Sequence, residues 1–294
     1  MALETEHRAA GHKGDVAQHS HASAPGPHDA TIAAIRQLHR RRRFAMKLSQ
    51  KIDLSLQSFV RLNATDWHPH MDAKSRERVR KEVVALISKV RAGATGDKFD
   101  MVRDAIESSD QAAAPALAMR KTCEKAMEKL ARQLPGYSFI EATRGAGDLG
   151  FATIIGETGD LSNYATVSKV WKRLGFAPHD GHAGSTWKRP TWRPRALSAE
   201  EWTENPFAST RYSLMRMIAE SLFKAQWVGK SKTEDGKGRP NGPYGEIYAV
   251  RAAHTATTHP DWTPAHYQAD ALRVMMKRFL CDLCVAWWAE SPRT

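Results

Sequence analysis

Residues 144–160, RGAGDLGFATIIGETGD, contain a pair of glycines beside an arginine, and residues of these types at this spacing could form a binding site. Gly145 and Gly147 permit backbone angles that other residues avoid, and a bare main chain lets a phosphate group approach closely. The amides that open the following helix favour an anion, and the helix dipole adds to this attraction. With Arg144 as a point contact, the stretch predicts a turn that binds backbone phosphates without reading sequence.

Two other interpretations of this turn stay open at the level of sequence. A tight turn between two packed helices needs the same glycines and binds nothing. A dinucleotide-binding loop is disfavoured, because no clear strand precedes the turn and the third glycine of the GxGxxG pattern is displaced.

Cations interleaved with tryptophans follow the turn. The basic residues are Lys169, Lys172, Arg173, Lys188, Arg189, Arg193 and Arg195, and the tryptophans among them are Trp171, Trp187 and Trp192. Basic side chains give salt-dependent affinity for phosphates, and aromatic faces stack on splayed bases. We therefore expect the turn and these cations to form one cradle for a sugar–phosphate chain. Trp171 continues an apolar pattern with Val167 and Leu174, so it is expected to be a core residue instead.

The overall charge also favours an acidic partner. The 44 Lys and Arg residues outnumber 32 Asp and Glu residues, which gives a net charge of +12 and an isoelectric point near 9.7. Such an excess attracts polyanions over a long range, and nucleic acid is the commonest of them. A basic soluble enzyme is the alternative.

The three cysteines predict neither a disulfide framework nor a metal site. Cys281 and Cys284 form a CxxC, but they lie in the apolar helix pattern VMMKRFLCDLCVAWW, and no second ligand pair exists for zinc. We expect both to be small core residues. Free thiols favour a reducing compartment, so a cytoplasmic location is predicted. No membrane association is expected, because the first 30 residues lack a signal-peptide pattern and other apolar runs are shorter than the roughly 18 residues that span a bilayer.

The part of the chain before the turn reads as helical. Apolar residues at three-and-four spacing predict one long helix over residues 31–63, capped by Asp29 or Thr31. The seam consists of Ile35, Leu38, Ala45, Ile52, Leu56 and Phe59. The opposite face carries the run HRRRR at residues 39–43, with Lys47, Lys51 and Arg61. This face is either solvated or offers several phosphate contacts on one rod.

Two further helices are predicted before residue 135. Val79, Val83, Leu86, Ile87 and Val90 mark the buried face of the second, which the glycines of RAGATGDK end. After a short segment at residues 99–106, a third helix over residues 113–134 has a seam of Ala116, Met119, Cys123, Ala126 and Leu130. The three form an antiparallel or coiled-coil region, whose long seams favour a homo-oligomer.

From Pro135 onward the segments shorten and glycines cluster. FIEATR and LGFATIIGET read as two short helices joined by GAGD, which is the layout of a helix-hairpin-helix motif. The predicted fold class is mainly α. It has a disordered tail over residues 1–30, the helical coiled-coil region over 31–134, and a helical domain over 135–294.

The order of these pieces resembles the insertion-sequence one-hundred-ten transposases, also called bridge-RNA recombinases. The similar stretches are FIEATRGAGDLGFATIIGETGDL, VSKVWKRLGFAP and HDGHAGST, then NPFASTRYSLMRMIAESLFKAQW and AHYQADALRVMMKRFLCDLCVAWW. The resemblance covers about residues 31–290 and is closest over 134–184. It implies a coiled-coil region before a transposase domain, with DNA or a structured guide RNA as the partner.

Two departures from the family shape the expected function. The family's DEDD carboxylates, which hold magnesium in a RuvC-like domain, have no counterpart in this sequence, and two-metal phosphoryl transfer needs such clustered acids. Magnesium is therefore expected only if a partner chain supplies the carboxylates. The family's serine nucleophile follows its GLAP-like segment, whereas here the turn reads His182-Ala183-Gly184-Ser185. Ser185 with His179 or His182 as a base would restore that role, and a plain turn serine is the alternative.

The sequence thus predicts a transposase-related, nucleic-acid-binding protein that acts in DNA transposition or recombination without cleaving DNA alone. The alternatives are a serine-dependent recombinase subunit that needs a partner chain and a non-catalytic helical scaffold or regulatory protein. A Gly/Lys-rich loop at residues 228–246 contains a GKS tripeptide without the upstream glycine of a nucleotide-binding P-loop, so nucleotide hydrolysis is not expected. As a basic loop, it is expected to order on nucleic acid.

Overall fold

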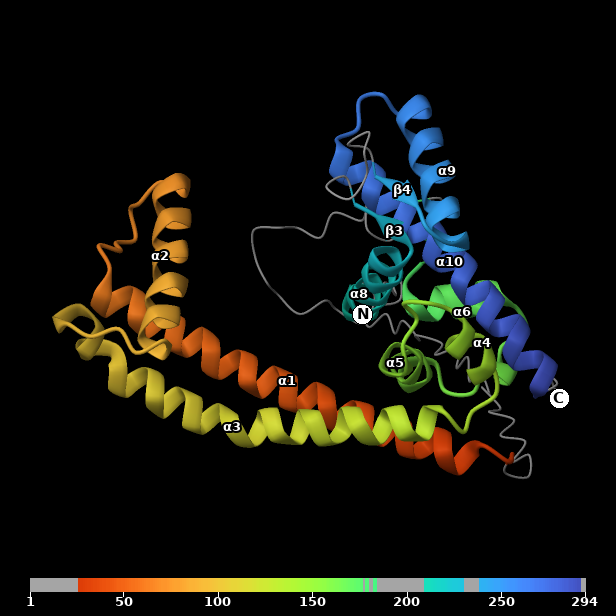
Figure 1. Cartoon of the computed structure of the whole chain (residues 1–294), viewed down its shortest axis with the longest axis horizontal. Helices are drawn as coiled ribbons and strands as arrows, with labels where there is room; N and C mark the ends of the chain where they lie inside the picture. The colour runs from red at the N-terminus through yellow and green to blue at the C-terminus, as the bar shows by residue number, and fades with distance from the viewer. Residues whose placement is uncertain (1–25, 177, 180–181, 184–208, 230–237, 292–294) are drawn as a thin grey trace, which may run out of the picture.

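The computed structural model describes residues 26–176, 178–179, 182–183, 209–229 and 238–291, and it is mainly α, as predicted (Figure 1). The helices are α1 (Asp29–Ala64), α2 (Ala73–Arg91), α3 (Asp97–Ala131), α4 (Tyr137–Ala142), α5 (Asp148–Thr158), the 3-10 helix η1 (Leu161–Asn163), α6 (Val167–Leu174), α8 (Ser209–Ala225), α9 (Pro243–Thr258) and α10 (Pro264–Glu290). Two short antiparallel pairs join β1 (Pro178–His179) to β2 (His182–Ala183) and β3 (Trp227–Val228) to β4 (Arg239–Pro240).

Helices α1 and α3 lie side by side as an antiparallel rod, and α2 packs at the end of the rod farthest from the other helices (Figure 1). At a rise of 1.5 Å per residue, the 36 residues of α1 extend about 54 Å. The tip of the rod has a hydrophobic core of its own, built from α1, α2 and α3 around Val60, Val79, Val83 and Val102. Three helices before residue 135 are therefore present as predicted, although Phe59 and Met119 of the predicted seams are exposed. A coiled-coil supercoil stays a prediction.

The expected division of the third helix is wrong. Helix α3 runs without interruption from Asp97 to Ala131, so the separate segment at residues 99–106 does not exist. Pro115 lies inside the helix and is exposed. Water can therefore satisfy the carbonyl group that its missing amide leaves without a partner. The neighbouring alanines favour helix strongly enough to carry it across the proline.

The second hydrophobic core fills the body formed by α4 to α10. Its centre is α10, where Met275, Leu280, Cys284 and Trp287 are fully buried. The prediction for the thiols is confirmed for Cys284, whereas Cys281 is only half-buried. Ile32, Ile35, Met127 and Ala131 belong to the same core, so the near ends of α1 and α3 pack as part of the body. In the described part of the chain, no helix is both long and apolar enough to cross a membrane.

Candidate nucleic-acid interface

The glycine turn at residues 143–147 joins α4 to α5. The amide of Ala146 donates to the carbonyl of Thr143 at 3.1 Å, and Ala146 is buried. Gly145 and Gly147 have φ angles of +93° and +64°, which other residues rarely adopt. The sequence therefore located a tight turn correctly, and the two short helices on either side of it exist.

The neighbours of Gly145 explain why this residue is glycine. A Cβ atom at this position would lie 2.5 Å from the Cβ of Ala225 and 3.0 Å from the Cα of Leu222, so the turn packs directly against α8. The exposed Arg144 donates to the carbonyl of Asn241, and its own carbonyl accepts from Nε2 of Gln226 at 2.9 Å. Packing thus accounts for Gly145, and the exposed Gly147 is the part of the turn with open space beside it.

The first turn of α5 already contains a negative charge. The carboxylate of Asp148 pairs with Nε of Arg132 at 2.8 Å and accepts from the hydroxyl of Tyr137 at 3.1 Å. A carboxylate at a helix start offsets the same dipole that would attract a phosphate. The adjoining cavity of about 330 Å³ has apolar walls that include Leu149, Met217 and Ile218. The turn is therefore less suited to a phosphate than its sequence indicates.

Helix α6 carries the cations that follow the turn. Lys169, Lys172 and Arg173 are exposed, and their three-and-four spacing places them on one face of the helix. The other face is anchored by Trp171, which is half-buried and donates through Nε1 to the carbonyl of Lys277 at 3.2 Å. Nζ of Lys277 lies 4.6 Å from the centre of the indole ring. The prediction that Trp171 belongs to the core is confirmed.

The remaining predicted site residues lie outside the described residues. These are Ser185, Trp187, Lys188, Arg189, Trp192, Arg193 and Arg195. Just before them, β1 and β2 pair His179 with His182 across a short hairpin. The stacking role expected for Trp187 and Trp192 and the role of Ser185 therefore stay predictions. The Gly/Lys-rich loop also includes residues that lie outside the described ones, 230–237, so its ordering on nucleic acid stays a prediction as well.

A buried carboxylate near the end of α5 is the feature that sequence reasoning missed. Glu157 accepts from Nε2 of His39 at 2.9 Å and from Nη1 of Arg43 at 3.0 Å. Its second oxygen accepts from Nε of Arg211 at 2.9 Å. His39 lies over Gly156, where a Cβ atom would come within 2.7 Å of the imidazole ring. One side chain thus ties α1, α5 and α8 together.

The electrostatics of Glu157 follow from these partners. Burial alone would raise the pKa of the Glu157 carboxyl. Hydrogen bonds from His39 and Arg211, with the electrostatic attraction of His39 and Arg43, outweigh the burial and lower this pKa from 4.5 to about 2. The carboxylate is therefore fully ionised at neutral pH and holds its cationic partners in place.

Four arginines from three helices surround the end of α5, and we call Arg36, Arg43, Arg173 and Arg211 the arginine cluster. Arg173 donates through Nε to the carbonyl of Glu157 at 3.0 Å. Nη1 of Arg36 lies 3.9 Å from the position a Cβ atom would take on Gly159. Burial raises the pKa of the Tyr164 hydroxyl, and the charges of Arg173, Arg211 and Arg36 act against it. These side chains therefore lie in one region, where the four positive charges of the arginines outnumber the single negative charge of Glu157.

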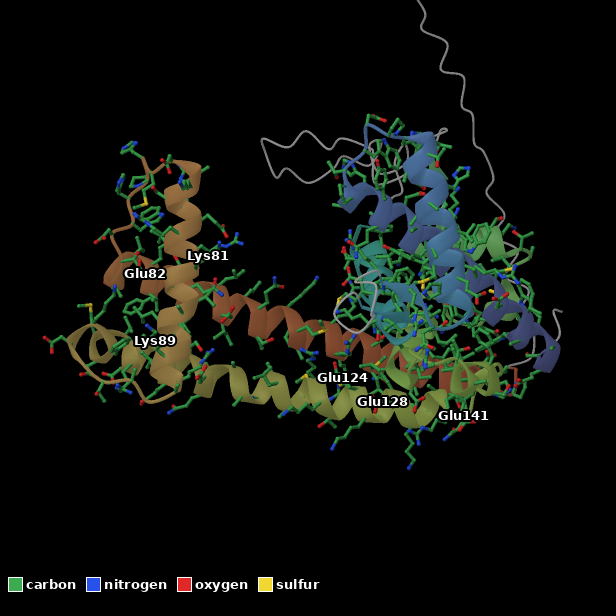
Figure 2. All side chains as sticks on the ribbon, turned by 45° about the horizontal axis from the view of Figure 1, so that its top comes forward. Lys81, Glu82, Lys89, Glu124, Glu128 and Glu141 are labelled. Atoms are coloured by element: carbon green, nitrogen blue, oxygen red, sulfur yellow. The ribbon has the colours of Figure 1, made fainter. Side chains whose placement is uncertain are left out.

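The face assigned to the HRRRR run needs correction. His39 and Arg42 are buried, because His39 bonds to Glu157 and Nε of Arg42 pairs with Glu124 at 2.8 Å. Figure 2 shows Glu124 on α3, along the rod. Arg40, Lys47 and Lys51 of the predicted face are exposed, and Arg36 joins them, so that exposed cations repeat along α1 at intervals of four and seven residues. This spacing puts them on one face, which we call the α1 basic face.

One signal in the sequence could have revealed Glu157. It ends an otherwise apolar run, FATIIGE, in which residues 151–155 are all buried. An ionised carboxylate in such a place requires cationic partners, because burying an unpaired charge is very costly. The partners themselves lie 118 and 54 residues away along the chain, and no local pattern points to them.

Comparison of the chain with protein-family models, with curated proteins and with solved structures found no match. Among the described residues, no group of three or more His, Cys, Asp or Glu side chains is arranged to hold a metal ion. The site therefore has to be interpreted from its own geometry and charge.

Proposed function

We propose that this protein binds nucleic acid through the arginine cluster and the exposed cations beside it. The observation that carries the proposal is the gathering of four arginines at the end of α5: Arg43 and Arg211 pair with the buried carboxylate of Glu157. Arg173 donates to the main-chain carbonyl of Glu157, and Arg36 lies beside Gly159. Gathering like charges destabilises a fold unless an anionic partner offsets them, and a chain of phosphates supplies many negative charges at regular spacing. The α1 basic face and Lys169 and Lys172 of α6 extend the positive surface.

The biological setting that we propose is DNA transposition or recombination. Its support is the resemblance of residues 134–184 to the bridge-RNA recombinase family, whose partners are DNA and a structured RNA. The cations of the cluster would contact phosphates, which are alike in every sequence, so they would position the protein and leave target choice to other contacts. Autonomous cleavage is not part of the proposal, because the sequence has no counterpart of the family's clustered magnesium-binding carboxylates.

Removing two exposed cations of α6 should weaken binding in a salt-dependent way. For the double variant Lys169→Gln/Lys172→Gln we expect a roughly tenfold loss of affinity for duplex DNA or structured RNA at low salt. The slope of log affinity against log salt concentration should become shallower by about two, one for each lost phosphate contact. Filter binding over a salt series measures both quantities.

A matched control is Lys121→Gln/Lys125→Gln, which removes the same charge from exposed positions of α3. It should change the slope little. A parent protein whose affinity does not respond to salt would contradict the proposal and favour a helical scaffold that binds another protein. Using duplex DNA and a structured RNA in parallel shows which of the two polymers is preferred.

A further inference from the structure

A second cavity lies at the tip of the rod, between α1 and α2. Its volume is about 670 Å³, and its lining combines Arg61, Trp67, Arg76 and Arg80 with Glu77 as the acidic residue. Val83 forms part of the wall and belongs to the core of the tip. The cavity is therefore supported by packed side chains and lined by a guanidinium-rich, aromatic surface.

Arg61 has an incomplete set of partners. Its guanidinium group lies 4.7 Å from the centre of the Trp67 ring, and Nη2 donates to the hydroxyl of Ser58 at 3.3 Å. Nε of Arg61 is buried and has no hydrogen-bond partner. A buried donor without an acceptor is unfavourable, and an anionic ligand in the cavity is one means of satisfying this guanidinium group.

The other two guanidinium groups are exposed and have few protein partners. Nη2 of Arg76 donates to the carbonyl of Pro69 at 3.1 Å, which ties the loop that carries Trp67 to α2. Nε of Arg80 lies 3.5 Å from Glu77, and both of these side chains are substantially exposed. Three positive groups thus face one carboxylate, so the cavity favours a ligand with negative charge.

The rest of α2 strengthens this preference. The helix contains seven cations, Lys74, Arg76, Arg78, Arg80, Lys81, Lys89 and Arg91, against the two acids Glu77 and Glu82. Figure 2 shows Lys81, Glu82 and Lys89 on this helix. Ion pairs reduce the excess only in part: Glu82 is bound by Lys98 at 2.6 Å, and Arg91 by Asp110 at 2.5 Å. An anionic polymer would therefore be attracted to the tip as a whole.

We propose that this cavity binds a nucleotide unit of a single-stranded nucleic acid. The phosphate would pair with Arg61, Arg76 and Arg80, and the base would pack against Trp67. An acidic peptide could use the same cations, but it has no base to pack against the partly exposed indole ring beside Arg61, whereas aromatic rings are the usual platform for unpaired bases. The choice of nucleic acid as the ligand rests on the proposed function, and the tip cavity would be a second binding site beside the arginine cluster. Arg61 is 18 residues beyond Arg43 on α1, a helical distance of about 27 Å.

The test measures binding of a fluorescein-labelled single strand of twelve nucleotides to the full chain by anisotropy. Trp67→Leu should lower affinity about tenfold, since stacking on an aromatic ring is lost. Trp67→Phe keeps a ring and should retain most of the affinity. Arg80→Gln should lower it about threefold. Arg78→Gln, which removes another exposed cation of α2 that does not line the cavity, should have a smaller effect.

An abasic strand of the same length removes the bases and keeps the phosphates. The parent should bind it about tenfold more weakly than the normal strand, while Trp67→Leu should bind both strands alike. This comparison uses the unmodified protein, so it decides the question even if Trp67→Leu does not fold. Equal binding of the two strands by the parent would overturn the proposal.

Two further arms separate this site from the arginine cluster and from a site for free nucleotides. Lys169→Gln/Lys172→Gln should lose duplex affinity and keep the difference between normal and abasic strands, so the two proposals can fail independently. Adenosine monophosphate should compete only weakly, because it offers one phosphate group and none of the neighbouring contacts. Strong competition by this mononucleotide with no binding of the strand would overturn the assignment to a polymer.

Discussion

Replacing Glu157 with glutamine should lower the free energy of unfolding by about 3 kcal/mol at pH 7. The carboxylate has its pKa lowered from 4.5 to about 2, and each pKa unit corresponds to roughly 1.4 kcal/mol of preference for the charged form. Glutamine keeps the shape but leaves Arg43 and Arg211 without their counter-charge. Breaking a buried ion pair from one side is costly in this way. Urea denaturation followed by circular dichroism measures the loss.

The same carboxylate predicts how this stability depends on pH. Because the pKa is lower in the folded than in the unfolded state, the contribution of Glu157 is fully present above about pH 4.5 and declines as the pH falls toward about 2. The difference in stability between the parent and Glu157→Gln should therefore shrink over that range. Glu141→Gln is the control, since Glu141 is exposed on α4 (Figure 2). Equal stability of the parent and Glu157→Gln at pH 7 would contradict the buried ion-pair interpretation.

Gly145→Ala should destabilise the protein by about 2–4 kcal/mol, from overpacking against α8 and from the left-handed backbone. The new Cβ atom would lie 2.5 Å from Ala225, and the φ angle of +93° is unfavourable for alanine. Thermal or chemical denaturation measures the loss. A partial rescue is expected from the added substitution Ala225→Gly, because it removes the nearest atom.

Gly147→Ala is the matched control for this prediction. Gly147 also has a positive φ, but no atom lies within 4 Å of the new Cβ position. Only the backbone cost applies, which is about 1 kcal/mol. If the two substitutions cost the same, packing against α8 does not explain Gly145, and the backbone angle alone requires glycine at both positions.

The local features of this fold were predictable from sequence, and the long-range ones were not. The helix predicted over residues 31–63 matches the bounds of α1 within two residues, because an apolar seam at three-and-four spacing is a local signal. The glycine pair at 145 and 147 marked a real turn for the same reason. The start of α3 was not predictable in this way, since the burial of Val102 and Ile106 in the tip core depends on residues of α1 and α2 that are distant in the sequence.

Burial of charge was the main thing that sequence could not reveal. His39 and Arg42 belong to a run of cations, which is typical of a solvated face. Both are buried because their acidic partners, Glu157 and Glu124, come from other helices far along the chain. The arginine cluster could not be predicted for the same reason, because its members come from three helices, α1, α6 and α8, that are far apart in the sequence.

The two hydrophobic cores are connected by a stretch of rod in which few side chains are enclosed. No residue is fully buried over residues 46–55 of α1 or over 107–115 of α3. A region with so few enclosed contacts opens and bends at a lower free-energy cost than the packed ends. We therefore expect the rod to bend more easily between the two cores than at its packed ends. Under the proposed function, this bending would let the distance between the tip cavity and the arginine cluster adapt to a bound nucleic acid.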